Sequence, residues 1–223
     1  AARESGVGRE RGEDAELFLQ PQRIIEIGSG AGYDAAQMCA WGFDVTCLDV
    51  SSAALALVAE NAPCARRSLY DLHDELPFPD GSFDVVVSNM ALQYLAAEGM
   101  LGRFADIRRV LVPGGRLLFT VNSFADIRPG EEAIWLEPHF LLSHPGSVPR
   151  RFYTRADLLK LLAGWQVERL EHTGTGRWQG TKHVWRVAAR APQADAKVPA
   201  MAIDSSSSAR LTGSDLERRE GAV

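Results

Sequence analysis

Hydrophobic residues in the first half of the chain alternate between short apolar runs and stretches with helical spacing. The apolar runs predict strands at Arg23–Ile27, Phe43–Asp49, Arg67–Tyr70, Phe83–Asn89 and Arg116–Asn122. Helices are predicted between them at Tyr33–Trp41, from Ser51 or Ser52 to Asn61, and through Leu101, Phe104, Ile107, Val110 and Leu111. Strands separated by helices form parallel sheets. The pattern therefore predicts an α/β fold with a Rossmann-like, doubly wound sheet.

The pattern becomes less regular after this sheet. Residues 123–151 contain prolines together with Trp135, His139 and His144, and we expect them to form a substrate-side insertion. A capping box at Thr154–Asp157 predicts a helix through Leu162 that Gly164 ends. Two extended runs, Trp165–Glu171 and Lys182–Ala189, are joined by a Gly/Thr-rich loop and predict an antiparallel pair.

Length and composition indicate one domain followed by a tail. Residues 1–190 suit a single α/β domain, with a short helix expected at Asp14–Gln20 before Pro21. Residues 191–223 are rich in Ala, Ser and charged residues, so we expect a polar, flexible tail.

Charge and cysteine content narrow the classes of partner. The net charge of −5 argues against nucleic acid as a partner, because phosphate binding needs a surplus of Lys and Arg. No apolar run reaches the roughly 18 residues that span a bilayer, and the polar start does not resemble a signal peptide. Cys39, Cys47 and Cys64 suggest neither a disulfide framework nor a metal site. We therefore expect a cytoplasmic protein with reduced cysteines and no membrane partner.

A glycine-rich turn follows the first predicted strand. Glu26 lies near the end of that strand, and the turn reads Gly28-Ser29-Gly30-Ala31-Gly32. Ligands of open parallel sheets bind beyond the carboxyl ends of the strands, so this turn is the predicted site of a nucleotide-like cofactor. Asp49 ends the second strand, where an acid can accept both hydroxyls of a ribose. The alternative is that the glycines serve packing alone.

The glycine spacing separates two classes of cofactor. Dinucleotide oxidoreductases carry G-x-G-x-x-G with a pyrophosphate at the helix N-terminus, whereas this chain carries G-x-G-x-G with Glu26 two residues before the first glycine. A carboxylate in that place repels a pyrophosphate and attracts the ammonium group of an amino-acid moiety. The pattern therefore favours a cationic cofactor over a dinucleotide.

Residues 23–122 resemble the class I S-adenosylmethionine-dependent methyltransferases, and most closely their small-molecule group. The resemblance is carried, in the family's order, by the E-x-G-x-G-x-G turn, Asp49, Asp71-Leu72, the run LPFPDGSFDVV at 76–86 and VPGG at 112–115. It implies a methyltransferase whose last strand runs antiparallel to the rest. It also implies S-adenosylmethionine as the cofactor and S-adenosylhomocysteine as the product.

Carried over position by position, the resemblance implies contacts along three turns. The first turn surrounds the methionine part at Glu26, Gly28, Ser29, Gly30 and Gly32. Asp49 holds the ribose, and the adenine lies against Val50, the carboxylate of Asp71 and the amide of Leu72. Asn89, through its carbonyl, and Met90 line the sulfonium, with Gln93 and Tyr94 near the substrate. The alternatives are a turn cap for Asp71 and ordinary helix positions for Gln93 and Tyr94.

Methyl transfer from a sulfonium needs no protein nucleophile, so the candidate catalytic residues are bases and substrate contacts. A base is required only for a poorly acidic hydroxyl or a protonated amine. His139 and, less strongly, His144 are the candidate bases, and Tyr153 is a candidate substrate contact. The alternative for each histidine is a solvated loop residue. Arg150 and Arg151 either meet a substrate carboxylate or form a solvated surface.

The acceptor is the least defined part of the prediction. Ser88-Asn89-Met90-Ala91 stands where relatives that methylate amino groups of bases or protein amides carry a D/N-P-P-Y-type turn. We therefore expect transfer to an oxygen or nitrogen atom of a small molecule, by a monomer or homodimer. The alternative is a catalytically inactive subunit or interaction module of the same fold.

Overall fold

The structure is a computed structural model that describes residues 22–127, 133–144, 146–178 and 180–193 of the 223-residue chain. The predicted helix Asp14–Gln20 and all but the first three residues of the predicted tail lie outside the described residues. In the part of the chain that is described, no helix is long and apolar enough to cross a membrane.

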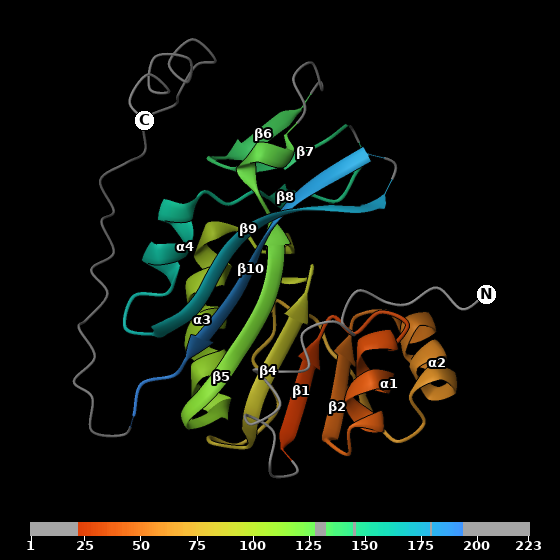
Figure 1. The fold of residues 1–223 in the computed structure, drawn as a ribbon. Helices are drawn as coiled ribbons and strands as arrows, with labels where there is room; N and C mark the ends of the chain where they lie inside the picture. The colour runs from red at the N-terminus through yellow and green to blue at the C-terminus, as the bar shows by residue number, and fades with distance from the viewer. Residues whose placement is uncertain (1–21, 128–132, 145, 179, 194–223) are drawn as a thin grey trace.

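The elements follow the predicted alternation of strands and helices. In chain order they are β1 (Arg23–Ile27), α1 (Tyr33–Ala40), β2 (Asp44–Asp49), α2 (Ser52–Asn61), β3 (Arg66–Leu69), β4 (Phe83–Asn89), η2 (Leu92–Tyr94), α3 (Ala97–Val110), β5 (Leu111–Asn122), η3 (Phe124–Asp126), β6 (Ile134–Glu137), β7 (Phe140–Leu142), β8 (Arg150–Arg151), α4 (Arg155–Leu161), β9 (Gln166–Trp178) and β10 (Gly180–Arg190). A small sheet of order β6-β7-β8 lies above the carboxyl end of β5 (Figure 1).

The main sheet confirms the predicted fold class. Its seven strands have the order β3-β2-β1-β4-β5-β10-β9. The strands from β3 to β5 pair in parallel, and β10 pairs antiparallel with β5 and with β9. The strand order reverses between β1 and β4, because β2 and β3 lie on one side of β1 while β4 and β5 lie on the other. Open α/β sheets bind ligands beyond the carboxyl ends of the strands at such a switch point.

Helices cover both faces of the sheet, and the alternation within β1 shows how each face is filled. Ile25 and Ile27 belong to the core cluster beneath α3 and α4. Ile24 points to the opposite face and packs in the cluster that α1 and α2 cover. Because side chains alternate along a strand, Glu26 also points toward the face of α1 and α2. The fold therefore buries this carboxyl group next to the glycine turn.

Three predicted elements differ in extent from the structure. Strand β5 begins at Leu111 and runs through Pro113-Gly114-Gly115, with a register shift against β4 between Phe83 and Val85. The loop expected between the last two strands is itself paired, so β9 and β10 form one long hairpin. The insertion at 123–151 contains the small sheet. Its short strands are separated by prolines and show no regular alternation of hydrophobic residues, so they were not predicted.

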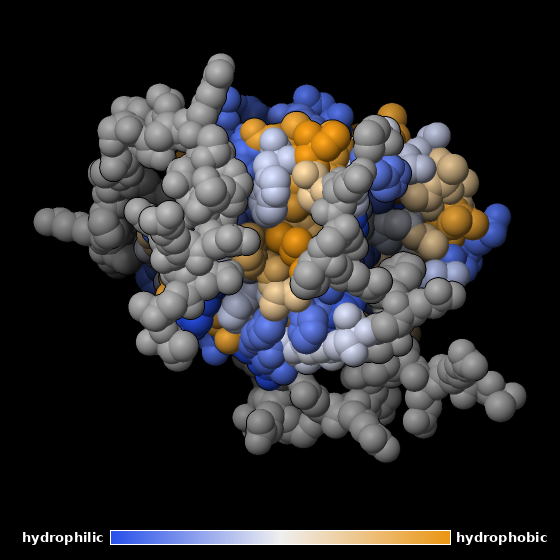
Figure 2. Space-filling model, turned by 90° about the horizontal axis from the view of Figure 1, so that it is seen from above, coloured by the Kyte–Doolittle hydropathy of each residue, from blue (hydrophilic) through white to orange (hydrophobic). Residues whose placement is uncertain are grey.

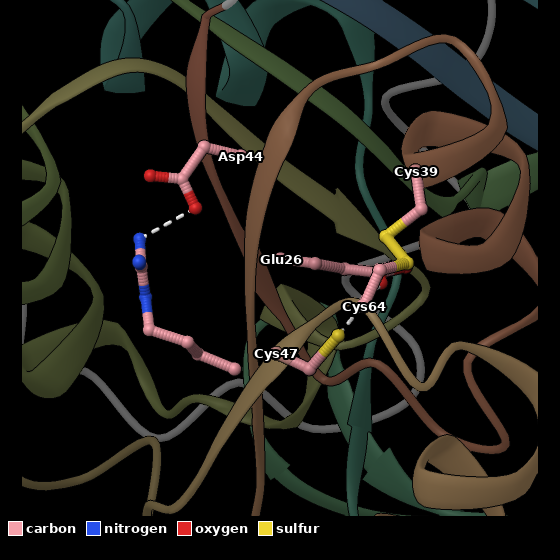
Figure 3. Close-up of a disulfide and its surroundings, with 6 residues drawn as sticks. Glu26, Cys39, Asp44, Cys47 and Cys64 are labelled. Carbon is pink, nitrogen blue, oxygen red and sulfur yellow. Dashed lines mark hydrogen bonds and ion pairs between the residues drawn. A yellow bond between two sulfur atoms is a disulfide. The ribbon is translucent and has the colours of Figure 1, made fainter.

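The expectation that the cysteines form no disulfide is wrong. Cys39 near the end of α1 is bonded to Cys64 after α2, with 6.4 Å between the Cα atoms (Figure 3). The two residues are 25 positions apart and carry no motif, but α1 and α2 lie side by side on the sheet. Cys47 is free and buried. The cytoplasmic location, which rested on reduced cysteines, stays a prediction.

Candidate active site

The glycine turn is tied to the end of β2 by backbone hydrogen bonds and by one carboxylate. The amides of Gly28 and Ser29 donate to the carbonyl of Leu48 at 2.8 and 3.1 Å. Asp49 accepts from the Gly30 amide at 2.8 Å and from the Ser51 amide at 2.9 Å. The predicted ribose-binding acid is therefore held against the turn by the backbone before any ligand binds.

The three glycines of the turn have different surroundings, although all have positive φ angles, of 75° at Gly28, 53° at Gly30 and 78° at Gly32. A Cβ added to Gly28 would overlap Ala91, and one added to Gly32 would lie 3.0 Å from Val58. At Gly30 nothing lies within 4 Å of the added Cβ. Packing thus explains Gly28 and Gly32, while Gly30 alone leaves space beside the backbone.

Three carboxyl groups gather around this turn. Glu26 is only 2% exposed, and burial raises its pKa to about 8, with smaller contributions from the nearby charges of Asp34 and Asp49. The thiol of Cys47 points toward its carboxyl group, with the sulfur 3.8 Å from Oε2 (Figure 3). Sequence reasoning missed Asp34, although an acid in the first turn after a glycine motif was the available signal. The negative charge favours a cationic ligand.

The turn also contains a polar group without a strong partner among the described residues. The Ser29 hydroxyl is buried and makes no hydrogen bond of good geometry there, and its polar neighbour is the thiol of Cys47, a weak partner. Buried polar groups are nearly always satisfied in native proteins, so an unpaired one indicates a ligand or a water. Together with the open space at Gly30 and the three acids, Ser29 fits the amino-acid end of S-adenosylmethionine.

Two of the three predicted adenine contacts, Val50 and Asp71, line a hollow, whereas Leu72 packs against the core. A space of about 380 Å³ is lined by Val50 after β2 and by Tyr70, Asp71 and Pro77 of the following loop, among others. Hydrogen bonds from the backbone and ring of His73 lower the pKa of Asp71, and both end on its Oδ1. Oδ2 accepts no hydrogen bond among the described residues, so its acceptor capacity is available.

The segment after β4 approaches the turn from the other side. Asn89 donates from its side chain to Asp34 at 3.0 Å, which joins β4 to the start of α1. Met90 has a φ of 61°, rare for a residue with a side chain, and its amide donates to Thr120. Such strained residues concentrate at functional sites. Gln93 is buried and accepts from the Asn122 amide, whereas Tyr94 is exposed.

The small sheet β6-β7-β8, which we call the cap, carries the predicted base. His139 Nδ1 lies 2.8 Å from Asp157 Oδ2, and its ring centroid is 4.8 Å from that of Phe124. Burial alone would raise the pKa of Asp157, but hydrogen bonds from His139 and Thr154 outweigh it and lower the pKa to about 2. Trp135 packs beside Phe124 and is 43% exposed. Seen from above, this end of the molecule carries a hydrophobic band (Figure 2).

The other candidates of the second half are Tyr153, His144 and Arg151. Tyr153 is 1% exposed, and its hydroxyl approaches the Leu92 carbonyl and the Met100 sulfur at 3.4 Å. Its placement favours a packing role. His144 lies in an exposed turn with Ser147. Arg151 is buried and bonded to Glu137, so it forms no solvated surface.

Comparison with known sequences decides the family. Residues 25–119 match the sequence family described as a methyltransferase domain. Residues 25–119 therefore form a class I S-adenosylmethionine-dependent methyltransferase domain. The match covers the acid-led glycine turn, Asp49, Asp71 and the segment after β4, which are the parts of the chain that form the site described above.

Curated methyltransferases share the same region. A malonyl-[acyl-carrier protein] O-methyltransferase of Halorhodospira halophila is 35% identical over 106 residues, which are 45% of this chain and 35% of that protein. A demethylmenaquinone methyltransferase of Tropheryma whipplei is 30% identical over 98 residues, 44% of this chain and 40% of that protein. The matched region of this chain therefore spans less than half the length of either relative.

Solved structures extend the likeness of fold beyond the sequence match. An S-adenosylmethionine-dependent methyltransferase from Methanosarcina mazei superimposes with a TM-score of 0.67 at 19% identity, covering 81% of this chain and 98% of that one. One from Mesorhizobium loti gives 0.63 at 21% identity, covering 82% and 99%. The methyltransferase fold thus includes the last hairpin as well as the cofactor half.

Proposed function

We propose that this methyltransferase moves the methyl group of S-adenosylmethionine to an oxygen atom of a small-molecule acceptor. The observation that carries the proposal is the glycine turn, where Asp34 and Asp49 lie close enough to Glu26 to raise its pKa and the buried Ser29 hydroxyl makes no hydrogen bond of good geometry. Anionic cofactors are disfavoured there, and a ligand with an ammonium and a sulfonium group is favoured.

Each part of the cofactor has residues suited to hold it. Ser29 and the open backbone at Gly30 suit the amino-acid end, and the buried Glu26 can ionise to pair with its ammonium group when the cofactor binds. Asp49 suits the ribose hydroxyls, because both its oxygens already lie at the rim of the turn. Val50 and Asp71 suit the two sides of an adenine. When bound, the cofactor supplies an electrophilic methyl group.

The chain's own contribution to the transfer is orientation and proton removal. Alignment of reactants can lower a barrier by about 7 to 11 kcal/mol, so we expect the segment after β4 and the cap to act mainly by aligning the acceptor with the methyl group. Asp157 is ionised and can only accept, so His139 keeps its proton on Nδ1 and offers Nε2 as a base. A hydroxyl acceptor would lose its proton to that nitrogen.

The relatives support an oxygen acceptor. The Halorhodospira halophila protein is named a malonyl-[acyl-carrier protein] O-methyltransferase. An Erwinia billingiae protein of the same name is 32% identical over 136 residues. The cap adds an apolar surface through Phe124 and Trp135. We therefore expect an acceptor with an apolar body and one carboxyl or hydroxyl group.

A transfer assay tests this proposal against the inactive-subunit alternative. The protein is incubated with S-adenosylmethionine labelled in the methyl group and with panels of apolar carboxylic acids, alcohols and amines. Label in an ester or ether, lost in the Asp49→Ala variant, supports the proposal. Cofactor binding without label transfer in any panel would favour the inactive subunit, and label on amines alone would contradict an oxygen acceptor.

A further inference from the structure

The loop between β3 and β4 has one side on the adenine hollow and the other against α3. It has no regular structure from Asp71 to Ser82, so its backbone groups need partners outside a helix or sheet. Asp71, Asp74 and Pro77 line the hollow. The shape of this wall therefore depends on what holds the loop from behind.

Side chains of α3 hold the loop through its backbone. Arg103 Nε donates to the Leu72 carbonyl at 3.0 Å, and the Leu76 amide donates to Asp106 Oδ2 at 2.6 Å. Arg109 donates to the carbonyls of Leu76 and Phe78 at 2.9 and 2.7 Å. Three side chains of one helix thus fix backbone groups at both ends of a seven-residue stretch.

The charges in this network are buried and paired with one another. Arg103 is 5% exposed and Asp106 9%, with 2.5 Å between Nη1 and Oδ2. Arg109 Nε donates to the other oxygen of Asp106 at 2.8 Å. The Arg103 guanidinium also lies 5.8 Å from the ring centre of Tyr70, which lines the hollow.

Burial of such a pair needs an explanation other than stability. Replacing buried ion pairs with apolar residues is often neutral or stabilising, because the desolvation cost offsets the attraction. Here the remaining hydrogen-bonding capacity of the pair is directed at one irregular loop. The pair therefore specifies a backbone conformation.

We infer that Arg103 and Asp106 are positioning residues that set the selectivity of this methyltransferase for adenine, by fixing Leu72 and Asp71 against the edge of the base. The inference rests on the proposed function, since it takes the hollow beside Val50 as the adenine site. Arg103 binds the Leu72 carbonyl, and the same peptide group carries the His73 amide, which donates to Asp71 Oδ1 at 2.9 Å. Arg103 therefore orients the Asp71 carboxylate through this peptide group. It acts through the loop and does not touch the ligand.

The test compares two ligands that differ only at the edge of the base. S-inosylhomocysteine carries a carbonyl oxygen where S-adenosylhomocysteine carries the amino group that Asp71 is expected to accept. Calorimetry gives the Kd of each for the wild type and for Arg103→Met. In that variant Asp106 keeps Arg109 as its partner, so no buried charge is left alone. Arg108→Met is the matched control, because Arg108 donates no hydrogen bond to the loop in the described part of the chain.

We expect Arg103→Met to weaken S-adenosylhomocysteine by roughly 10-fold, the loss of about one hydrogen bond. The Kd of S-inosylhomocysteine should change by less than about 2-fold, and the control should leave both constants unchanged. An equal loss for both ligands, or no loss in the folded variant, would overturn the inference. If Arg103→Met does not fold, Arg103→Lys carries the same comparison, since it keeps the charge and loses the Nε donor. A wild type that binds neither ligand would overturn the proposed function as well.

Discussion

Gly28 and Ala91 touch across the two ends of β1 and β4, so closely that a side chain at position 28 would occupy the place of the Ala91 methyl group. The contact joins the glycine turn to the segment that carries Met90. Gly30, two residues later, faces open space. Gly28 therefore allows the two segments to pack closely, and Gly30 leaves room for a ligand.

Alanine substitutions at these two glycines should separate stability from binding. Both residues have positive φ, which costs an L-residue about 1–2 kcal/mol, and overpacking against Ala91 adds about 1–3 kcal/mol at position 28 only. Gly28→Ala should therefore lower the melting temperature more than Gly30→Ala. Gly30→Ala should lose the greater share of S-adenosylmethionine affinity. Melting curves and calorimetry on both variants check this, and the reverse order would contradict the roles assigned here.

Glu26 should make the ligand-free protein less stable as the pH rises. Its pKa is raised from 4.5 to about 8 in the folded chain, so the unfolded chain releases this proton first. The stability it contributes is present below pH 4.5 and is lost progressively as the pH approaches 8. Glu26→Gln cannot lose the proton, so its melting temperature relative to the wild type should rise between pH 5 and pH 8.

The melting temperature reports how much stability the ionisation of Glu26 costs. A domain of this length changes its melting temperature by about 2–4 °C per kcal/mol. Saturating S-adenosylmethionine should shrink the difference, because a cationic ligand favours the ionised carboxyl group. A constant difference in melting temperature between wild type and variant from pH 5 to pH 8 would show that the pKa of Glu26 is not raised.

His139 should matter only for acceptors that must lose a proton. His139→Gln removes the base and is expected to lower kcat by about 100-fold or more for a hydroxyl acceptor. A carboxylic acid is already ionised, so its methylation should be nearly unaffected. The Kd of S-adenosylmethionine should not change. Steady-state rates for one acceptor of each kind test this, and an equal loss for both would assign His139 a packing role.

The Cys39–Cys64 disulfide should stabilise the part of the fold in which α1 and α2 pack on β1 and β2. Crosslinking residues 25 positions apart is worth about 3 kcal/mol in the chain-entropy account. Reduction should therefore lower the melting temperature by roughly 6–12 °C. The double variant Cys39→Ala, Cys64→Ala should melt near the reduced wild type and ignore the reductant. A wild type that melts alike with and without reductant would show that the bond does not form.

The cofactor half of the fold could be predicted because local signals and global fold agree there. The apolar run Phe83–Asn89 is the strand that the structure contains, and the capping box at Thr154 forms with both of its hydrogen bonds. The glycines of the predicted turn all have positive φ angles, which glycine adopts without strain. In this half, periodicity, turn residues and caps all point to the same arrangement.

The remainder depends on contacts between segments far apart in the sequence. The disulfide needs α1 and α2 to be neighbours, and the Asp34–Asn89 bond joins residues 55 positions apart. Tyr153 was predicted to contact a substrate because its burial depends on the packing of the folded chain and cannot be read from the residue type. The partnership of His139 with Asp157 could not be read for the same reason: Asp157 was visible only as a helix cap.

The most direct measurement is a calorimetric titration of the purified chain with S-adenosylmethionine, repeated on the Glu26→Ala and Asp49→Ala variants. We predict one site of micromolar Kd in the wild type and a loss of at least roughly 10-fold in each folded variant. Absence of heat in the wild type up to near-millimolar ligand, or an unchanged Kd in both variants, would contradict a sulfonium site at the acid-lined glycine turn.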